Sequence, residues 1–280
     1  MHVFKRIAIL QDFLETKRKQ KCTIGFVPTM GALHEGHLAL MRRAKSENDI
    51  LVVSIFVNPI QFNNPDDLLR YPRTIENDSK LLETVLCDAV FVPSVEEIYP
   101  VPETTIYNFG AIEQVMEGAF RKGHFNGVAI VVRKLFEIVK PNKAYFGEKD
   151  FQQRAIIQKM VENYAIPTEI ISCEIVREPD GLAMSSRNMR LNETERTIAP
   201  QIFKTLKKAV LKKQELSPEL MREYVEKQFK KIDAFNVEYV EIADEKHLQP
   251  IKTWHETKHA RIFVALQLGN VRLIDNIRIF

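Results

Sequence analysis

The chain has 280 residues, which at about 150 residues per domain predicts roughly two domains. Apolar residues make up 45% and charged residues 28%, a mixture typical of folded globular proteins and unlike disordered or collagen-like chains. The formal net charge of +3 argues against nucleic acid as the main partner but leaves room for a local anion pocket, because polyanion-binding domains usually carry a larger or more clustered cationic excess.

Cysteine usage and hydropathy indicate the compartment. Cys22, Cys87 and Cys173 are odd in number and form no CxxC pair, so we expect neither a disulfide framework nor a thiolate metal site. The N-terminal segment lacks the uninterrupted apolar run of a signal peptide. The most apolar stretch, residues 50–57, is far too short for a membrane span. These features predict a cytoplasmic protein without membrane contact.

Apolar periodicity predicts that helices and strands alternate along the first part of the chain. In chain order we predict a helix on Ile7, Leu10 and Leu14, a strand over 23–27, a helix on Leu38, Met41 and Ala44, a strand over 50–57, a helix on Leu81, Leu82 and Val85, a strand over 88–92, a helix over 128–139, a strand over 144–146, a helix over 156–164 and a strand over 168–176. This alternation is typical of an α/β fold with a parallel sheet and crossover helices.

The pattern changes near residue 176. The polar segment 177–192 is interpreted as a linker or an active loop, and apolar stripes over 202–210 and 220–232 then predict two helices. Residues 262–268 alternate, and Gly269-Asn270 precedes a second alternating run, which predicts a β-hairpin with a two-residue turn. The sequence therefore predicts a larger α/β domain over 1–175 and a smaller α+β domain over 176–280.

The segment after the first buried strand carries the strongest chemical signal. Parallel sheets bind ligands outside the carboxyl ends of their strands. Here the sequence runs from Gly25 through Met30 to His34-Glu-Gly-His37, from strand to helix start. A helix N-terminus favours phosphate, and two imidazoles three residues apart share one face. A metal-binding pair or two solvated histidines at a helix cap are the alternatives, and the strand–loop–helix context favours phosphate.

Four further segments carry polar groups, each with a structural alternative. The amides of Asn58-Pro-Ile-Gln61 suit a small polar ligand, and the alternative is an ordinary turn. Arg121-Lys-Gly-His124 is either a cationic binding loop or a solvated loop with a helix cap at Asn126, and Glu148-Lys149-Asp150 either neutralises phosphate charge or is a solvated helix start. Met184-Ser185-Ser186-Arg187 either surrounds a polyphosphate with hydroxyl and guanidinium groups or is a serine-rich hinge.

Taken together and in order, these segments resemble one family over essentially the whole chain. VPTMGALHEGH, SIFVNPIQF, YPRT, GHFNGV, FGEKDFQQ, DGLAMSSRN and RLIDN match the pantoate–beta-alanine ligases, members of the nucleotidyltransferase superfamily. The resemblance implies a Rossmann-like parallel-sheet domain with a smaller α+β C-terminal lid. It also implies the ATP-dependent condensation of pantoate with beta-alanine to pantothenate through a pantoyl adenylate, with release of pyrophosphate and AMP, in coenzyme A biosynthesis.

The resemblance also implies residue roles. The catalytic groups would be His34, His37, Lys149 and Arg187. ATP would contact Pro28, Thr29, Met30, His34, His37, Gly147, Glu148, Lys149, Asp150, Val176, Met184, Ser185, Ser186 and Arg187. Pantoate would bind Asn58, Gln61 and Gln153, with Gln61 shared by beta-alanine. Mg²⁺ would bridge phosphate oxygens with few protein ligands, so no dedicated protein metal site is expected, and the chain would form a homodimer.

One departure and three alternatives accompany this interpretation. Lys122 stands where the family commonly has a proline, which leaves the placement of Arg121 open. A related nucleotidyltransferase that stops at adenylyl transfer would have no reason to keep the Gln61 and Gln153 segments. An RNA-binding module is suggested by the lysines over 204–231, but interspersed glutamates and an apolar stripe indicate solvated helix faces. An inactive relative is disfavoured by the intact His34, His37, Lys149 and Arg187.

Overall fold

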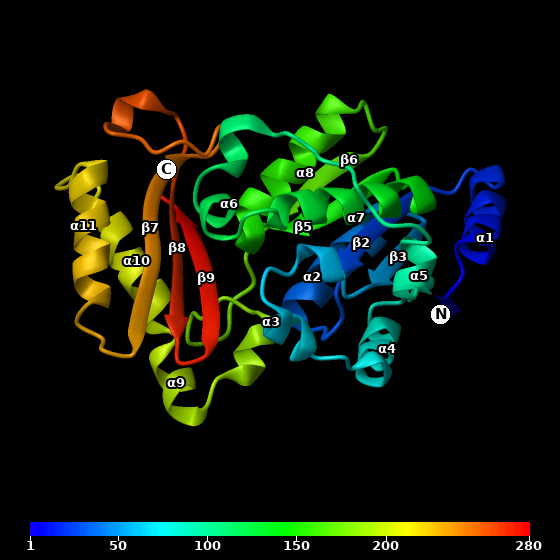
Figure 1. Cartoon of the computed structure of the whole chain (residues 1–280), viewed down its shortest axis with the longest axis horizontal. Helices are drawn as coiled ribbons and strands as arrows, with labels where there is room; N and C mark the ends of the chain where they lie inside the picture. Colours follow the sequence, from blue (N-terminus) through cyan, green and yellow to red (C-terminus); the bar gives the residue numbers. More distant parts are fainter. The chain divides into compact units, whose positions relative to one another are not determined.

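The computed structural model describes residues 1–280 and contains a six-stranded and a three-stranded sheet (Figure 1). The strands are β1 (His2–Phe4), β2 (Ile24–Thr29), β3 (Ile50–Ile55), β4 (Ala89–Phe91), β5 (Lys143–Gly147), β6 (Glu169–Cys173), β7 (Phe235–Asp244), β8 (Ala260–Leu268) and β9 (Val271–Arg278).

Helices connect these strands. The α-helices are α1 (Ile7–Lys19), α2 (Glu35–Glu47), α3 (Pro65–Leu69), α4 (Ile75–Thr84), α5 (Val95–Ile98), α6 (Glu117–Phe120), α7 (His124–Val139), α8 (Phe151–Asn163), α9 (Glu193–Ile198), α10 (Gln201–Leu211) and α11 (Pro218–Phe229). Short 3₁₀ turns are η1 (Pro59–Gln61), η2 (Gly110–Glu113), η3 (Glu148–Asp150), η4 (Ser186–Arg190) and η5 (Trp254–Glu256).

The chain folds into two compact units. Unit 1 comprises residues 1–109, 121–148 and 153–174. Unit 2 comprises residues 175–280 together with two short excursions, 110–120 and 149–152. The second excursion contains Lys149, one of the predicted site residues.

Unit 1 is built on the six-stranded sheet, in which every strand pair is parallel and the order is β1-β4-β3-β2-β5-β6. One face is covered by α2 and α4, whose Met41 and Leu82 are fully buried with Val53 of β3. On the other face Phe136 of α7 meets Phe26 of β2 edge-on. Burial on both faces explains the continuous apolar run of β3. Strands β3 and β5 flank β2 on its two sides, so the carboxyl ends of these three parallel strands lie side by side.

Unit 2 contains the antiparallel sheet β7-β8-β9. Helices α10 and α11 pack on it through a shared core that includes Leu206, Phe229, Ile262 and Leu273. Gly269 adopts a positive φ of 56° in the two-residue turn between β8 and β9, as the predicted hairpin requires.

The predicted fold class, a parallel α/β sheet followed by a smaller α+β region, is confirmed. Two strands escaped the prediction. Strand β1 is an edge strand of only three residues, too short to give a periodic pattern. In β7 a register shift between Val237 and Tyr239, together with charged residues that are paired within the unit, interrupts the alternation of apolar and polar residues. The segment 177–192 is an ordered part of unit 2 and not a linker, because Arg177 pairs with Ala183 and forms an ion pair with Asp275.

Candidate active site

The loop between β2 and α2 carries the two histidines. Pro28 and Thr29 end β2, Met30 follows, and His34 is the N-cap of α2. The backbone N–H of His34 donates to Nδ1 of His37 at 3.4 Å, and the ring centroids lie 4.0 Å apart. Because Nδ1 of His37 accepts, the neutral ring carries its proton on Nε2. His37 is therefore oriented as a hydrogen-bond donor through Nε2 in this arrangement.

A buried carboxylate that sequence reasoning missed holds this loop. Asp78 of α4 is fully buried, and its two oxygens accept from the backbone N–H groups of Ala32 at 3.0 Å and Leu33 at 2.8 Å. The Thr74 hydroxyl donates to the same carboxylate at 3.1 Å. Gly31 and Ala32 have positive φ values of 80° and 49°, and non-glycine residues rarely adopt this conformation without such support. The YPRT motif just before α4 was the available signal.

A cluster of amides follows β3. Asn58 is 1% exposed, and its Nδ2 donates to Oε1 of Gln61 at 3.0 Å while its Oδ1 accepts from the Tyr99 hydroxyl at 2.8 Å. These bonds orient the Gln61 amide with its NH₂ group directed at Sδ of Met30, at 3.1 Å. A thioether is a weak acceptor, so this NH₂ group can donate to a better oxygen acceptor. Met30 also brings the β2 loop and the β3 turn together.

His124, at the start of α7, supports the backbone of the same turn. Its Nδ1 lies 2.9 Å from the Gln61 carbonyl oxygen, and its Nε2 lies 3.0 Å from Nη1 of Arg121. A guanidinium only donates, so Nε2 accepts and Nδ1–H donates to Gln61. The Arg121 side chain is thus directed at His124 even though Lys122 follows it. Asn126, considered above as a cap, lies inside α7, whose N-cap is Gly123.

Gly127 allows α7 to approach this turn closely. A Cβ at this position would lie 2.5 Å from the carbonyl oxygen of Ile60 and 2.8 Å from Cα of Gln61. In addition, Nδ2 of Asn58 donates to the Gly127 carbonyl at 3.1 Å. The GHFNGV motif therefore serves the placement of Gln61, through His124 and Gly127.

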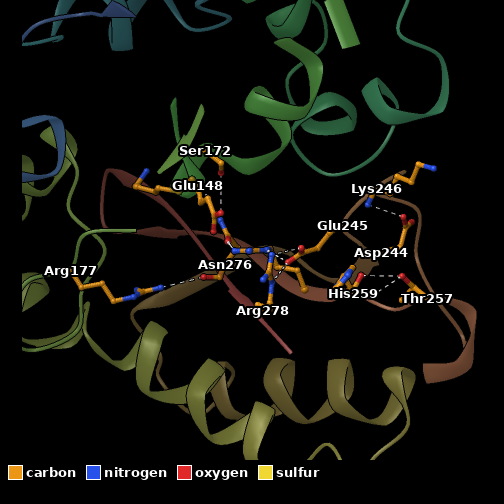
Figure 2. Close-up of polar contacts among 12 residues, drawn as sticks. Glu148, Ser172, Arg177, Asp244, Glu245, Lys246, Thr257, His259, Asn276 and Arg278 are labelled. Atoms are coloured by element: carbon orange, nitrogen blue, oxygen red, sulfur yellow. Dashed lines mark hydrogen bonds and ion pairs between the residues drawn. The ribbon is translucent and has the colours of Figure 1, made fainter. Parts of the chain in front are cut away.

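The turn after β5 contains the next predicted group. Gly147 ends β5, and a Cβ there would meet only Cδ1 of Leu40, at 4.0 Å, so the backbone is open to close approach. The Ser172 hydroxyl of β6 donates to the Glu148 carboxylate at 3.0 Å (Figure 2). Lys149 is half-buried and Asp150 exposed, and both lie in the η3 turn.

The two glutamines after this turn differ in environment. Gln152 is 4% exposed, donates to the carbonyls of Ile112 and Val115 at 2.8 Å each, and accepts from the N–H of Glu117. It is therefore a structural residue of unit 2. Gln153 is half-buried on the first turn of α8 and belongs to unit 1.

The remaining predicted residues lie in a hairpin-like loop of unit 2. The Met184 N–H donates to the Val176 carbonyl at 3.0 Å, which closes the loop at its base. Ser185 caps the η4 turn, its Oγ accepting from the N–H of Arg187 at 3.2 Å. Ser186 is buried. The loop thus presents consecutive hydroxyl and guanidinium groups from a fixed backbone.

Within unit 1 the structure pairs His34 with His37 and Asn58 with Gln61, and the contact between Gln61 and Met30 links the two loops. It orders Lys149 and the 184–187 loop in unit 2. No group of three or more His, Cys, Asp or Glu side chains is arranged to hold a metal ion. None of the helices has the length and apolar character needed to cross a membrane.

The chain matches one family of known proteins over nearly its full length. The model of the pantoate-beta-alanine ligase family matches residues 2–278. A pantothenate synthetase from Porphyromonas gingivalis (strain ATCC 33277) is 50% identical over 278 residues, which is 99% of each chain. One from Bacteroides fragilis (strain ATCC 25285) is 48% identical over the same length and coverage.

Solved structures agree with this match. The crystal structure of pantothenate synthetase from Thermus thermophilus has a TM-score of 0.94 and 40% sequence identity, covering 100% of both chains. A pantoate-beta-alanine ligase from Francisella tularensis, crystallised with Beta-gamma ATP and Beta-alanine, has a TM-score of 0.84 and 38% identity, covering 100% of this chain and 98% of its own.

Proposed function

The chain belongs to the pantoate–beta-alanine ligase family, and we propose that the residues described above carry the two steps of its ATP-dependent reaction. The enzyme condenses pantoate with beta-alanine to form pantothenate. In the proposed first step a pantoate carboxylate oxygen bonds to the α-phosphorus of ATP, and pyrophosphate leaves with the electrons of the broken P–O bond. In the second step the beta-alanine amine bonds to the acyl carbon, AMP leaves with the electrons of the broken acyl C–O bond, and the nitrogen gives up a proton to solvent.

The observation that carries this proposal is the arrangement after β2 and β3. A histidine pair at a helix N-terminus suits phosphate, and an oriented amide in contact with Met30 of the same β2–α2 loop suits a small hydroxy acid. Both lie at the edge where a parallel sheet binds ligands. A site for phosphate next to a site for a small polar carboxylate is what formation of an acyl adenylate requires.

In unit 1, His37 would donate from Nε2 to a phosphate oxygen while its Nδ1 stays on the His34 N–H. The Gln61 NH₂ group would leave the weak thioether acceptor and donate to pantoate. Asn58 keeps Oε1 of Gln61 occupied, so the amide cannot flip without losing a bond. Phosphoryl transfer needs positioning and charge stabilisation more than covalent help, and these groups supply the positioning.

In unit 2, Lys149 would neutralise charge at the α-phosphate, and Ser185, Ser186 and Arg187 would hold the leaving pyrophosphate. The nucleotide would also contact Val176 and Met184 of unit 2 and, in unit 1, Pro28, Thr29, Met30, Gly147 and Glu148. Pantoate would contact Gln153 of unit 1. Unit 2 would act as the lid that keeps water from the labile adenylate.

Mg²⁺ would enter as Mg-ATP. The donor chemistry fits, because Mg²⁺ prefers oxygen ligands, keeps several waters and needs few protein groups, and the chain offers the exposed Asp150 carboxylate. When bound, the ion would neutralise phosphate charge. We further propose that the enzyme acts in the cytoplasm and as a homodimer, as the family resemblance implies.

The test is AMP formation from Mg-ATP and pantoate, with and without beta-alanine. We expect AMP and pantothenate only when beta-alanine is present, and pantoate-dependent ATP–pyrophosphate exchange without it. Exchange without any response to beta-alanine would contradict the ligase in favour of adenylyl transfer to another acceptor. Absence of both activities, with retention on a polyanion at about 0.15 M salt, would favour nucleic-acid binding instead.

A further inference from the structure

The RLIDN motif near the C-terminus has no role in the reaction as described so far. It lies on β9, an edge strand of the unit 2 sheet, and its last two residues, Asp275 and Asn276, are 4% and 2% exposed. Buried polar side chains in folded proteins are nearly always hydrogen-bonded. Their partners therefore show what the motif holds in place.

Asn276 holds the backbone of Lys149. Its Nδ2 donates to the Lys149 carbonyl oxygen at 3.0 Å, across 127 residues of sequence. Its Oδ1 accepts from Nη1 of Arg261, which fixes the amide orientation so that the NH₂ group faces Lys149. An amide suits this position, because its oxygen accepts from Arg261 while its NH₂ group donates to Lys149.

The residue after the turn is clamped by the neighbouring strand. The Phe151 ring meets the Phe263 ring edge-on with centroids 5.7 Å apart, and the Arg261 guanidinium lies over it at 4.3 Å. Phe263 is the direct β8 partner of Asn276. The same patch of sheet thus fixes the η3 turn on both sides of Asp150.

Asp275 holds the other basic segment of unit 2. Its carboxylate accepts from both terminal nitrogens of Arg177, at 2.7 and 2.9 Å. Arg177 also donates to the Asn276 carbonyl at 3.2 Å (Figure 2). Arg177 begins the loop that leads to Arg187. Adjacent residues of one strand therefore anchor both segments that we assign to phosphate charge.

We propose that Asn276 is a positioning residue for Lys149: it fixes the carbonyl of the turn from which the Lys149 side chain extends toward the reacting phosphate. The inference rests on the role proposed above for Lys149. A displacement of about 1 Å in a group that stabilises the transition state costs on the order of 100-fold in rate. The effect of losing Asn276 should therefore fall on turnover and be transmitted only through Lys149.

The test is Asn276→Asp, which keeps the acceptor for Arg261 and removes the donor to Lys149. We expect pantoate-dependent ATP–pyrophosphate exchange to fall about 10- to 100-fold, with little change in the KM for ATP or pantoate. Asn270→Asp is the matched control, because it makes the same change at an exposed position of the same hairpin and should retain wild-type exchange. If Asn276→Asp is unfolded by circular dichroism, Asn276→Ser replaces it, since it removes the amide without adding charge.

A double-mutant cycle with Lys149→Ala separates positioning from a general structural effect. We expect Asn276→Asp to cause no further loss in the Lys149→Ala background. Wild-type exchange by the folded Asn276 variant, or a further 10-fold or greater loss on top of Lys149→Ala, would overturn the inference alone. Wild-type exchange by Lys149→Ala would overturn the proposed role of Lys149 and, with it, the inference.

Discussion

The buried carboxylate of Asp78 offers the sharpest test of how the loop between β2 and α2 is held. Its three hydrogen bonds connect α4 to the backbone of Ala32 and Leu33 and to Thr74. In Asp78→Asn one oxygen remains, but an NH₂ group replaces the other and faces a donor. A hydrogen bond to a charged group contributes about 1.5–3 kcal/mol, and an unsatisfied buried donor costs about 1–3 kcal/mol. We expect the free energy of unfolding to fall by roughly 2–4 kcal/mol.

The same change should affect catalysis. The Ala32 φ of 49° is a left-handed conformation that costs a non-glycine residue about 1–3 kcal/mol, so the released loop should relax. Because that loop leads into His34 and His37, we expect the adenylation rate to fall on the order of 100-fold. Urea unfolding measures the first effect, and pantoate-dependent ATP–pyrophosphate exchange measures the second.

Glu76→Gln is the matched control for Asp78→Asn. Glu76 lies in the same helical turn but is exposed, so loss of its charge should change the free energy of unfolding by less than about 0.5 kcal/mol. The reasoning is refuted if Asp78→Asn unfolds within about 0.5 kcal/mol of the wild type and exchanges pyrophosphate at the wild-type rate.

Three further predictions test other parts of the structure. Gln61→Ala should raise the KM for pantoate more than that for ATP in steady-state assays, and equal increases would contradict a pantoate site there. Gly127→Ala should lower the free energy of unfolding by about 1–3 kcal/mol and raise the KM for pantoate, because the new Cβ overlaps the Gln61 backbone; wild-type values for both would contradict this packing. Hydrogen bonds from the Thr105 hydroxyl, then from Lys134, lower the pKa of Glu103 from 4.5 to about 2. Its stabilising contribution is therefore full above pH 4.5 and is lost as the pH falls toward 2, so the stability difference between wild type and Glu103→Gln should shrink over that range in acid unfolding curves; a constant difference would refute it.

Local patterns in the sequence were enough to predict the fold class and the location of the chemical segments. The continuous apolar run of β3 and the apolar stripe of α7 indicated that these elements are buried. Gly269-Asn270 indicated a hairpin turn, because glycine readily adopts the positive φ that such a turn requires. The motifs after β2, β3 and β5 were assigned to one edge because parallel strands end together, and the strand order places these three strands side by side. The roles of the motif residues in the reaction stay predictions.

Strand β7 shows where pattern reasoning fails. Its Glu238 and Tyr239 break the expected alternation, yet both are partnered within unit 2, by Arg272 and Glu117. These partners are remote in sequence, so no local window contains the reason for the strand.

The same limit applies to the residues that support the site. By itself the sequence determined the residue types that follow each strand, and from them we predicted which side chains would meet phosphate, because residue type and position after a strand are local properties. Only the tertiary structure decided what holds them: Asp78 supports the Ala32 loop across 46 residues, His124 supports Gln61 across 63, and Asn276 supports Lys149 across 127. Such contacts form because the folded backbone brings residues that are far apart in sequence close together in space. Neither local spacing nor composition shows which of these residues become neighbours.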